Sequence, residues 1–459
     1  MAPNLPTRLI PPLGLAILTA CGGGPTPESA PAEPAGLAIV GAQLIDGSGG
    51  PPVADAVVLV RDGRVHAAGP RNTTEIPEGA EVVDATGKTI IPGLVDLHAH
   101  YRAPRSAAEQ ALRSQLYYGV TTTRSVGTDS AESVALMLEA HAGRPDLPRA
   151  FTAGLGFSYP EGFNSGFTNT PTTEEEARAM VREQAALGIH FTKMWINAVA
   201  EPNRKIPPEI RAAIVDESIK NGLIPIAHIN KESDGLQLLE VGLNEFLHST
   251  VRTFGPGAGV PMDDPEPSQA FLDLCLEKDC GFAPTLSVSQ NAWHFAEHPE
   301  LLDDPQLRAV MNPAALERFS DQETRASIVE ADGFEDRKAA FRQLLDFVKT
   351  AYDAGIKVAL GTDSGTANVP MGWGTHHELE LYVEAGLTPM ETLVAATATG
   401  AGRMPPVGEA DFGTLTAGKS ADLIVLNADP LTDIRNTLEI DRVMLRGECV
   451  DRDALLPSP

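Results

Sequence analysis

The 459-residue sequence is poor in cysteine, in aromatic residues and in basic residues. Its four cysteines are Cys21, Cys275, Cys280 and Cys449, and no two have the Cys-x-x-Cys spacing of a thiolate metal site. Cys275 and Cys280 could pair in a disulfide or remain free thiols. The 35 basic residues against 62 acidic ones give a net charge of −27, which would repel nucleic acid. Hydrophobic residues make up 42% of the chain, within the range of globular enzymes.

The apolar run near the start of the chain, residues 9–18, is too short to span a bilayer but suits the core of a signal peptide. The tetrapeptide that follows, Leu18-Thr19-Ala20-Cys21, resembles the lipobox of bacterial lipoproteins. We therefore predict a signal peptide over residues 1–21 and a flexible tether over residues 22–36. The mature protein would be exported and anchored to a bacterial membrane through lipidated Cys21, facing the periplasm. The alternative is an ordinary secretory signal with a chance cysteine.

From residue 41 onward, short β-rich runs alternate with helical stretches, which favours a parallel sheet or barrel. Eight runs are expected to be strands: residues 90–98, 120–126, 150–154, 190–195, 224–228, 245–248, 282–286 and 357–363. Helix starts are indicated by two capping boxes, Ser106-x-x-Glu109 and Thr388-x-x-Glu391. The sequence thus predicts the α/β class, with a (β/α)8 TIM barrel over residues 89–411.

The regions that flank the predicted barrel have a different pattern. Residues 37–88 and 412–452 contain short strands separated by Gly and Pro turns, and we expect them to pack together as one small β-sandwich domain. Residues 291–355, between the seventh and eighth strands, are expected to be largely helical. Loops on the catalytic face of a barrel vary most, so this segment is a candidate cover for the site.

Two histidines, His98 and His100, stand at the end of the first predicted strand. Because side chains alternate along a strand, both point to the same side, into the mouth of the barrel. Such a pair can bind one metal ion. Alone the motif is weak, because His-x-His is frequent by chance.

Four more polar residues end apolar strands: Lys193, His228, His248 and Asp363. A free ammonium buried at Lys193 would cost several kcal/mol unless paired. Reaction of the amine with CO2 would give a carbamate, which bridges two metals as a carboxylate does. Each residue alone has a structural alternative, a hydrogen bond to a carbonyl or extension to water. Together they gather where barrel enzymes collect catalytic groups, and the ligand types suit zinc, with manganese or cobalt also accepted.

Several segments resemble the amidohydrolase superfamily. Ile91-Pro92-Gly93-Leu94-Val95-Asp96-Leu97-His98-Ala99-His100 is similar to its first metal motif, and Gly361-Thr362-Asp363-Ser364-Gly365 to its last. Residues 118–124 resemble its second strand, and residues 376–423 resemble the branch of imidazolonepropionase and the Xaa-Pro dipeptidases. The likeness extends from about residue 37 to residue 449.

The resemblance implies a site with two divalent metals. His98, His100 and Asp363 would bind the more buried metal, and His228 and His248 the more exposed one. Carbamylated Lys193 would bridge them. Because imidazolonepropionases and most deaminases of the superfamily hold one metal and lack this lysine, Lys193 favours the dipeptidase-like branch. Residues 229–231 depart from the second histidine and glycine of many family dipeptidases.

Two such metals would lower the pKa of a shared water from 15.7 toward about 7. Asp363 would move its proton, and His248 or a nearby donor would help to hold the oxyanion. We therefore predict a metal-dependent hydrolase of amide bonds in small peptide or N-acyl substrates, which uses a metal-bridging hydroxide. The main alternative is a lactonase, carbamate hydrolase or organophosphate hydrolase on the same site; a minor one is a binding lipoprotein without activity. The sequence leaves open whether the chain forms a homo-oligomer.

A peptide-like substrate also needs a cation for its carboxylate. Arg102, Arg105 and Arg252 follow the metal motifs on the catalytic face, and His376 and His377 are further polar candidates. Each of them is equally compatible with a surface position. No substrate-binding residue is assigned on this basis.

Overall fold

The computed structural model describes residues 36–101, 104–196, 204–251, 262, 265–366 and 368–456. Cys21 and the predicted signal peptide lie outside these residues, as do residues 22–35 of the tether, Arg102 and Arg252. Within the described part of the chain, no helix is both long enough and apolar enough to cross a membrane. Cys275 and Cys280 are buried free thiols, and Cys449 is exposed.

Eight parallel strands make up the barrel. They are β6 (Leu94–Ala99), β7 (Val120–Ser125), β8 (Arg149–Thr152), β9 (Phe191–Trp195), β10 (Ile224–His228), β11 (Glu245–Leu247), β12 (Gly281–Ala283) and β13 (Lys357–Val358). Backbone hydrogen bonds close both seams: Leu97 N donates to Leu360 O (3.0 Å), and Phe157 N donates to Lys193 O (2.7 Å). The predicted (β/α)8 barrel is confirmed.

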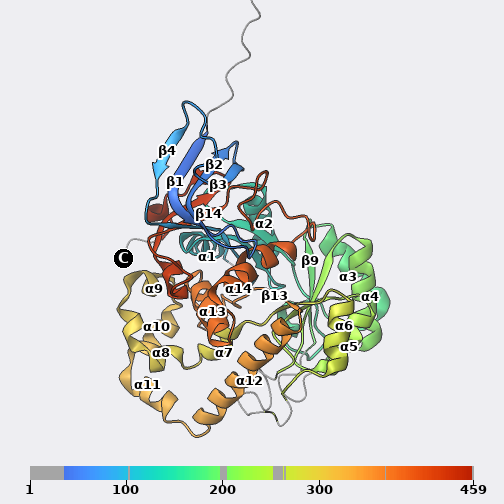
Figure 1. Cartoon of the computed structure of the whole chain (residues 1–459). Coiled ribbons are helices and arrows are strands. Elements are labelled where there is room, and N and C mark those ends of the chain that lie inside the picture. Colours follow the sequence, from blue (N-terminus) through green and yellow to red (C-terminus); the bar gives the residue numbers. More distant parts are fainter. Residues whose placement is uncertain are drawn as a thin grey trace, which may run out of the picture.

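Helices cover the outside of the barrel (Figure 1). They include α1 (Arg105–Tyr117), α2 (Ala131–Ala142), α3 (Glu174–Ala185), α4 (Pro208–Lys220), α5 (Glu232–Glu240), α6 (Gln269–Glu277), α13 (Trp373–Glu384) and α14 (Pro389–Val394). In α3, Ala177 and Val181 share the buried face, and the Thr173 hydroxyl accepts a hydrogen bond from the Glu176 amide at the first turn. The interior of the barrel is filled by apolar side chains of successive strands, such as Leu97, Phe191 and Leu247.

The sequence prediction was wrong at several element boundaries, and the last barrel strand, predicted over residues 357–363, ends at Val358. The run 90–98 is two strands, because β5 (Thr89–Pro92) joins the outer sheet and only β6 joins the barrel. Gly93 separates them, and a Cβ there would lie 2.1 Å from the Thr121 hydroxyl. The seventh strand ends at Ala283, since Thr285 has a left-handed φ of 55° and α7 (Leu286–Gln290) follows. Helix α1 begins at Arg105 without a side-chain cap, so Ser106 forms no capping box, whereas that of Thr388 is present.

The two flanks form one eight-stranded sheet. Its strands are β1 (Leu37–Leu44), β2 (Val53–Arg61), β3 (Arg64–Pro70), β4 (Glu81–Asp84), β5, β14 (Leu423–Leu426), β15 (Ile440–Leu445) and β16 (Glu448–Cys449). Strand β5 pairs antiparallel with β14, so segments over 300 residues apart lie side by side (Figure 1). Ile39 and Val58 share a core with Leu423 and Met444, which gives the flanks the character of a small sandwich.

The segment between β12 and β13 is largely helical, as predicted. After α7 it contains α8 (His294–Glu297), α9 (Pro305–Val310), α10 (Pro313–Ser320), α11 (Gln322–Val329) and the 20-residue α12 (Phe334–Asp353). Asp304, Asn312 and Asp321 cap α9, α10 and α11 through their side chains. These helices form the lower left part of Figure 1.

Candidate metal centre

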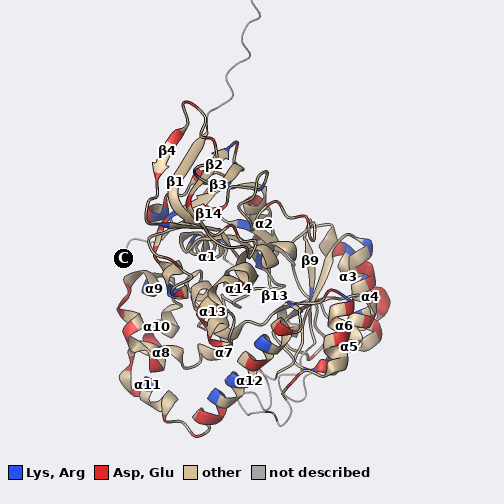
Figure 2. Ribbon diagram, viewed as in Figure 1, with Lys and Arg blue, Asp and Glu red and all other residues tan. Residues whose placement is uncertain are grey.

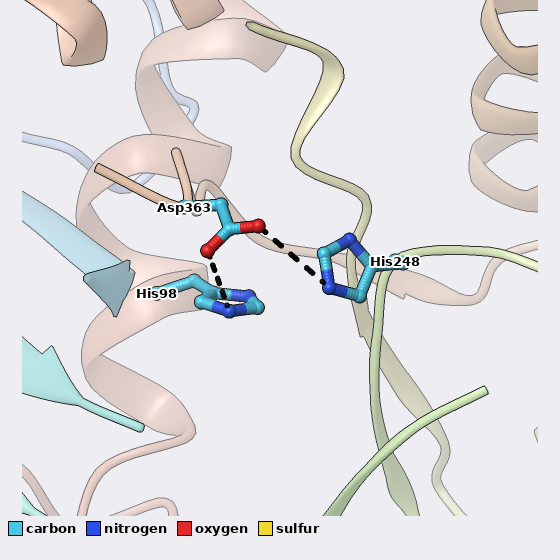
Figure 3. A group of neighbouring side chains, drawn as sticks. All are labelled: His98, His248 and Asp363. Carbon is cyan, nitrogen blue, oxygen red and sulfur yellow. Dashed lines mark ion pairs between the residues drawn. The ribbon is translucent and has the colours of Figure 1, made fainter. Parts of the chain in front are cut away.

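Three strand ends bring His98, His248 and Asp363 together (Figure 3). His98 lies on β6. His248 follows β11 directly, and Asp363 follows β13 after a short extension. The Nε2 atom of His98 is 3.4 Å from Oδ1 of Asp363, and Nε2 of His248 is 4.0 Å from Oδ2. One ligand atom from each of the three residues lies within 4.8 Å of the others, so they could share a metal ion.

The other predicted ligands surround this group. The Nε2 atom of His100 is 3.1 Å from Oδ1 of Asp363, and the His228 ring lies 3.9 Å from that of His248 between centroids. The four histidines and Asp363 line one cavity of about 350 Å³. All five are buried.

Lys193 lies at the base of this group on β9. Its side chain is fully buried, and its Nζ has no hydrogen-bond partner in the described structure. The amine is 4.9 Å from the centre of the Trp195 ring. Gly127 leaves room for it, because a Cβ at that position would lie 2.8 Å from Cγ of Lys193.

Two hydroxyl groups orient the histidine rings. The Thr128 hydroxyl is 3.0 Å from Nδ1 of His100, and the Thr285 hydroxyl is 2.6 Å from Nδ1 of His248. Both contacts turn Nε2 toward Asp363, as outer-shell partners of metal-binding histidines commonly do. The donor and acceptor roles of the His248 ring nitrogens depend on the tautomer, so the oxyanion role of His248 stays a prediction.

Burial governs the ionisation of the ligands. It lowers the pKa of His98 and of His228 well below the usual range, and that of His248 to about 3. Neutral imidazole is the form that binds metals. Burial alone would raise the pKa of Asp363, but the hydrogen bond and charge of His100 hold it below the usual value.

Burial also changes the pKa of Lys193. Desolvation lowers the pKa of Lys193 to about 7, against the attraction of Asp363. A buried amine with a pKa so low is partly unprotonated at neutral pH, which is the state that reacts with CO2. The orphaned Nζ and the imidazole and carboxylate donors around it therefore fit a pair of divalent metals bridged by a carbamate.

Glu378, on α13, is a supporting residue that the sequence did not reveal. Its fully buried carboxylate accepts hydrogen bonds from the amides of Leu286 and Ser287, both at 2.7 Å. These are the first amides of α7, directly after the Thr285 that contacts His248. Burial raises the pKa of Glu378 to about 8.

Three polar candidates lie away from the metal position. His376 contacts the Tyr118 carbonyl oxygen at 2.8 Å, and His377 contacts the Gln290 side chain at 2.7 Å. Arg105 forms an ion pair with Glu139. None of these three residues lines the cavity that contains the predicted metal ligands.

Comparisons with known proteins find relatives of the chain by sequence and by structure. The sequence profile of the Amidohydrolase family matches residues 335–450. An imidazolonepropionase of Salinispora tropica is 28% identical over 397 residues, which cover 82% of this chain and 86% of that protein. A proposed prolidase from Bifidobacterium longum is similar in structure, with a TM-score of 0.70, 27% identity, and coverage of 91% of this chain and 97% of that one. A Xaa-Pro dipeptidase with bound methionine shares the fold, with a TM-score of 0.69, 20% identity, and coverage of 90% and 99%.

Proposed function

Because the chain belongs to the amidohydrolase superfamily and is a hydrolase of carbon–nitrogen bonds, we propose that it cleaves amide bonds in small peptide or N-acyl substrates. The site would hold two divalent metals, with zinc as the first candidate and manganese or cobalt as the next. His98, His100 and Asp363 would hold one metal, and His228 and His248 the other. Lys193, as a carbamate, would bridge them.

Lys193 is the observation that carries this proposal. The relatives by sequence include imidazolonepropionases, and the similar structures include prolidases. The family resemblance of the sequence implies that enzymes of the first kind hold one metal and have no bridging lysine on the fourth strand. The buried, unpaired amine of Lys193 on β9 therefore favours the second kind of site.

Bound metals of this type lower the pKa of water and polarise a carbonyl group. The chain itself would supply the proton transfer. Asp363 is held ionised by its low pKa, so its carboxylate can accept a proton from water and deliver it to the leaving nitrogen. Its left-handed backbone, with φ of 59°, directs the side chain toward the histidines at the cost of local strain.

A substrate panel tests the proposal. Purified metal-loaded protein is assayed with dipeptides, N-acyl amino acids, lactones, carbamates, a phosphotriester and imidazolone propionate. The expected result is the highest kcat/KM for the dipeptides or N-acyl amino acids. A clear preference for lactones, carbamates or phosphotriesters would show that the same site catalyses another reaction. A preference for imidazolone propionate would contradict the role given to Lys193.

We also propose that the mature chain is anchored to a membrane through lipidated Cys21. The support is the lipobox-like segment before it and the Gly- and Pro-rich tether after it. In a Gram-negative host, the wild type should incorporate palmitate and enter the detergent phase, and Cys21→Ser should do neither. Unlabelled wild type in the periplasmic fraction would refute the anchor.

A further inference from the structure

A second cavity, of about 670 Å³, lies beside the metal centre. His100, Gly365 and Thr366 line both this cavity and the smaller one that contains the ligands. The two spaces therefore adjoin at this wall. A substrate with its scissile bond at the metal position would pass these three residues to enter the second cavity.

The walls of the second cavity are mainly apolar. Helix α1 contributes small side chains, among them Ala108 and Ala111, and the α9–α10 segment contributes Val310 and Met311. Alanines on one wall leave space that a larger residue would fill. Apolar surface of this kind suits an aliphatic or aromatic side chain.

The charge of this cavity differs from that of the rest of the protein. Acidic side chains are spread over outer helices such as α3 and α4 (Figure 2). Among the described residues that line the second cavity there is no Asp or Glu, but Arg318 of α10 lines it.

Arg318 is available for a ligand. No described carboxylate pairs with it, and its guanidinium lies 5.2 Å from the centre of the Phe319 ring. Arg105, by contrast, is committed to Glu139. An exposed guanidinium at the rim of an apolar cavity is suited to a carboxylate.

We propose that the second cavity is the subsite for an apolar amino-acid residue with a free carboxylate, which lies on the leaving side of the scissile amide. Its side chain packs against Ala108 and Ala111, and its carboxylate pairs with Arg318. This inference rests on the proposed amide hydrolysis and narrows it to dipeptides and N-acyl amino acids with a large apolar C-terminal residue.

Two variants test the subsite. Ala111→Phe fills the apolar wall, and Ala135→Phe, on an exposed position of α2, is its matched control. Ala111→Phe should lower kcat/KM for N-acetyl-leucine relative to N-acetyl-glycine by about 10-fold or more, and the control should leave this ratio unchanged. An equal effect of Ala111→Phe on both substrates would overturn the proposal.

Arg318→Gln tests the contact between Arg318 and the substrate carboxylate. Because Arg318 is exposed, the substitution should leave the fold intact. KM for N-acetyl-leucine should rise about 10-fold with little change in kcat, because the contact is present before and during the reaction. The C-terminal amide of the same substrate should be unaffected. If acid and amide respond alike, Arg318 does not bind the carboxylate.

Equilibrium binding separates this inference from the proposed function. In calorimetric titrations of the metal-loaded protein, L-leucine should bind more tightly than L-leucinamide, and Arg318→Gln should remove the difference. If this result is obtained while no amide is hydrolysed, the subsite stands and the proposed function fails. If amides are hydrolysed but the two ligands bind equally, the function stands and the subsite is refuted.

Discussion

The barrel contains two buried polar clusters that differ in how their charges are paired. At the start of β11, Glu245 forms ion pairs with Arg124 at 2.5 Å and Arg403 at 3.2 Å, and all three are almost fully buried. At the carboxyl ends of the strands, the ligand cluster contains the unpaired amine of Lys193. In the first cluster the charged side chains form ion pairs with one another, with one carboxylate between two guanidinium groups, whereas the amine of Lys193 forms no ion pair with a described carboxylate.

Backbone conformation shows the same contrast. His248 and Asp363 have left-handed φ angles of 66° and 59°, and so does Thr285, which contacts His248. Arg124, Glu245 and Arg403 have no such angles. Strain of this kind is retained where function requires it. The two clusters therefore differ both in the pairing of their charged side chains and in backbone conformation.

The largest effect is expected at Asp363, the proposed proton carrier. Asp363→Asn keeps an oxygen for the metal but cannot accept a proton at neutral pH, so kcat should fall by about 10² to 10⁴. Metal content, measured by elemental analysis, should remain above about half of the wild-type value through the other five ligands. If Asp363→Asn kept a kcat near that of the wild type, another residue would have to accept the proton.

The paired cluster should respond in stability instead. Glu245→Gln leaves the buried charges of Arg124 and Arg403 uncompensated, and we expect a loss of about 3–5 kcal/mol in the free energy of unfolding. Asp353→Asn, which removes an exposed partner of Lys349, should cost less than about 1 kcal/mol. Denaturant unfolding measures both. Folded Glu245→Gln protein should still bind the wild-type amount of metal. If it lost metal, the cluster around Glu245 would also contribute to metal binding.

A smaller effect is expected at Glu378, which supports the ligand cluster from α13. In Glu378→Ala, the amides of Leu286 and Ser287 lose their acceptor group, so the contact between Thr285 and His248 should loosen. Metal affinity or kcat should fall about 10- to 100-fold, as for other outer-shell partners. Glu384→Ala, on an exposed turn of the same helix, is the control. If both variants had the same metal affinity and kcat, Glu378 would not support the metal ligands.

The smallest change is expected in the pH dependence of carbamate formation at Lys193. Because burial lowers the pKa of Lys193 to about 7, the unprotonated amine increases as pH rises through 7 and is dominant above it. Uptake of ¹³C-labelled bicarbonate by metal-free protein, followed by NMR, should therefore rise between pH 6 and 8 and then level off about a pKa unit above 7. A rise only near the ordinary lysine pKa of about 10.4 would show that Lys193 is not the reactive amine.

The metal ligands could be predicted from the sequence because each one ends an apolar strand, and the barrel gathers strand ends on one face. Thr285, Glu378 and Arg318 could not. Their roles depend on contacts with residues or cavities far away in the sequence, such as the 92-residue separation between Leu286 and Glu378. The break at Gly93 was missed for a similar reason, since the apolar run continues across it and only the close approach of Thr121 separates the two strands.

The central claim is that Lys193 completes a two-metal site, and metal analysis of Lys193→Ala tests it most directly. Wild-type protein supplemented with zinc should contain about two equivalents of metal, whereas Lys193→Ala should lose metal and activity. Acetate or propionate with added zinc should partly restore both, because a short carboxylate can occupy the position of the carbamate. One equivalent or none in the wild type, or normal metal content in Lys193→Ala, would contradict the account.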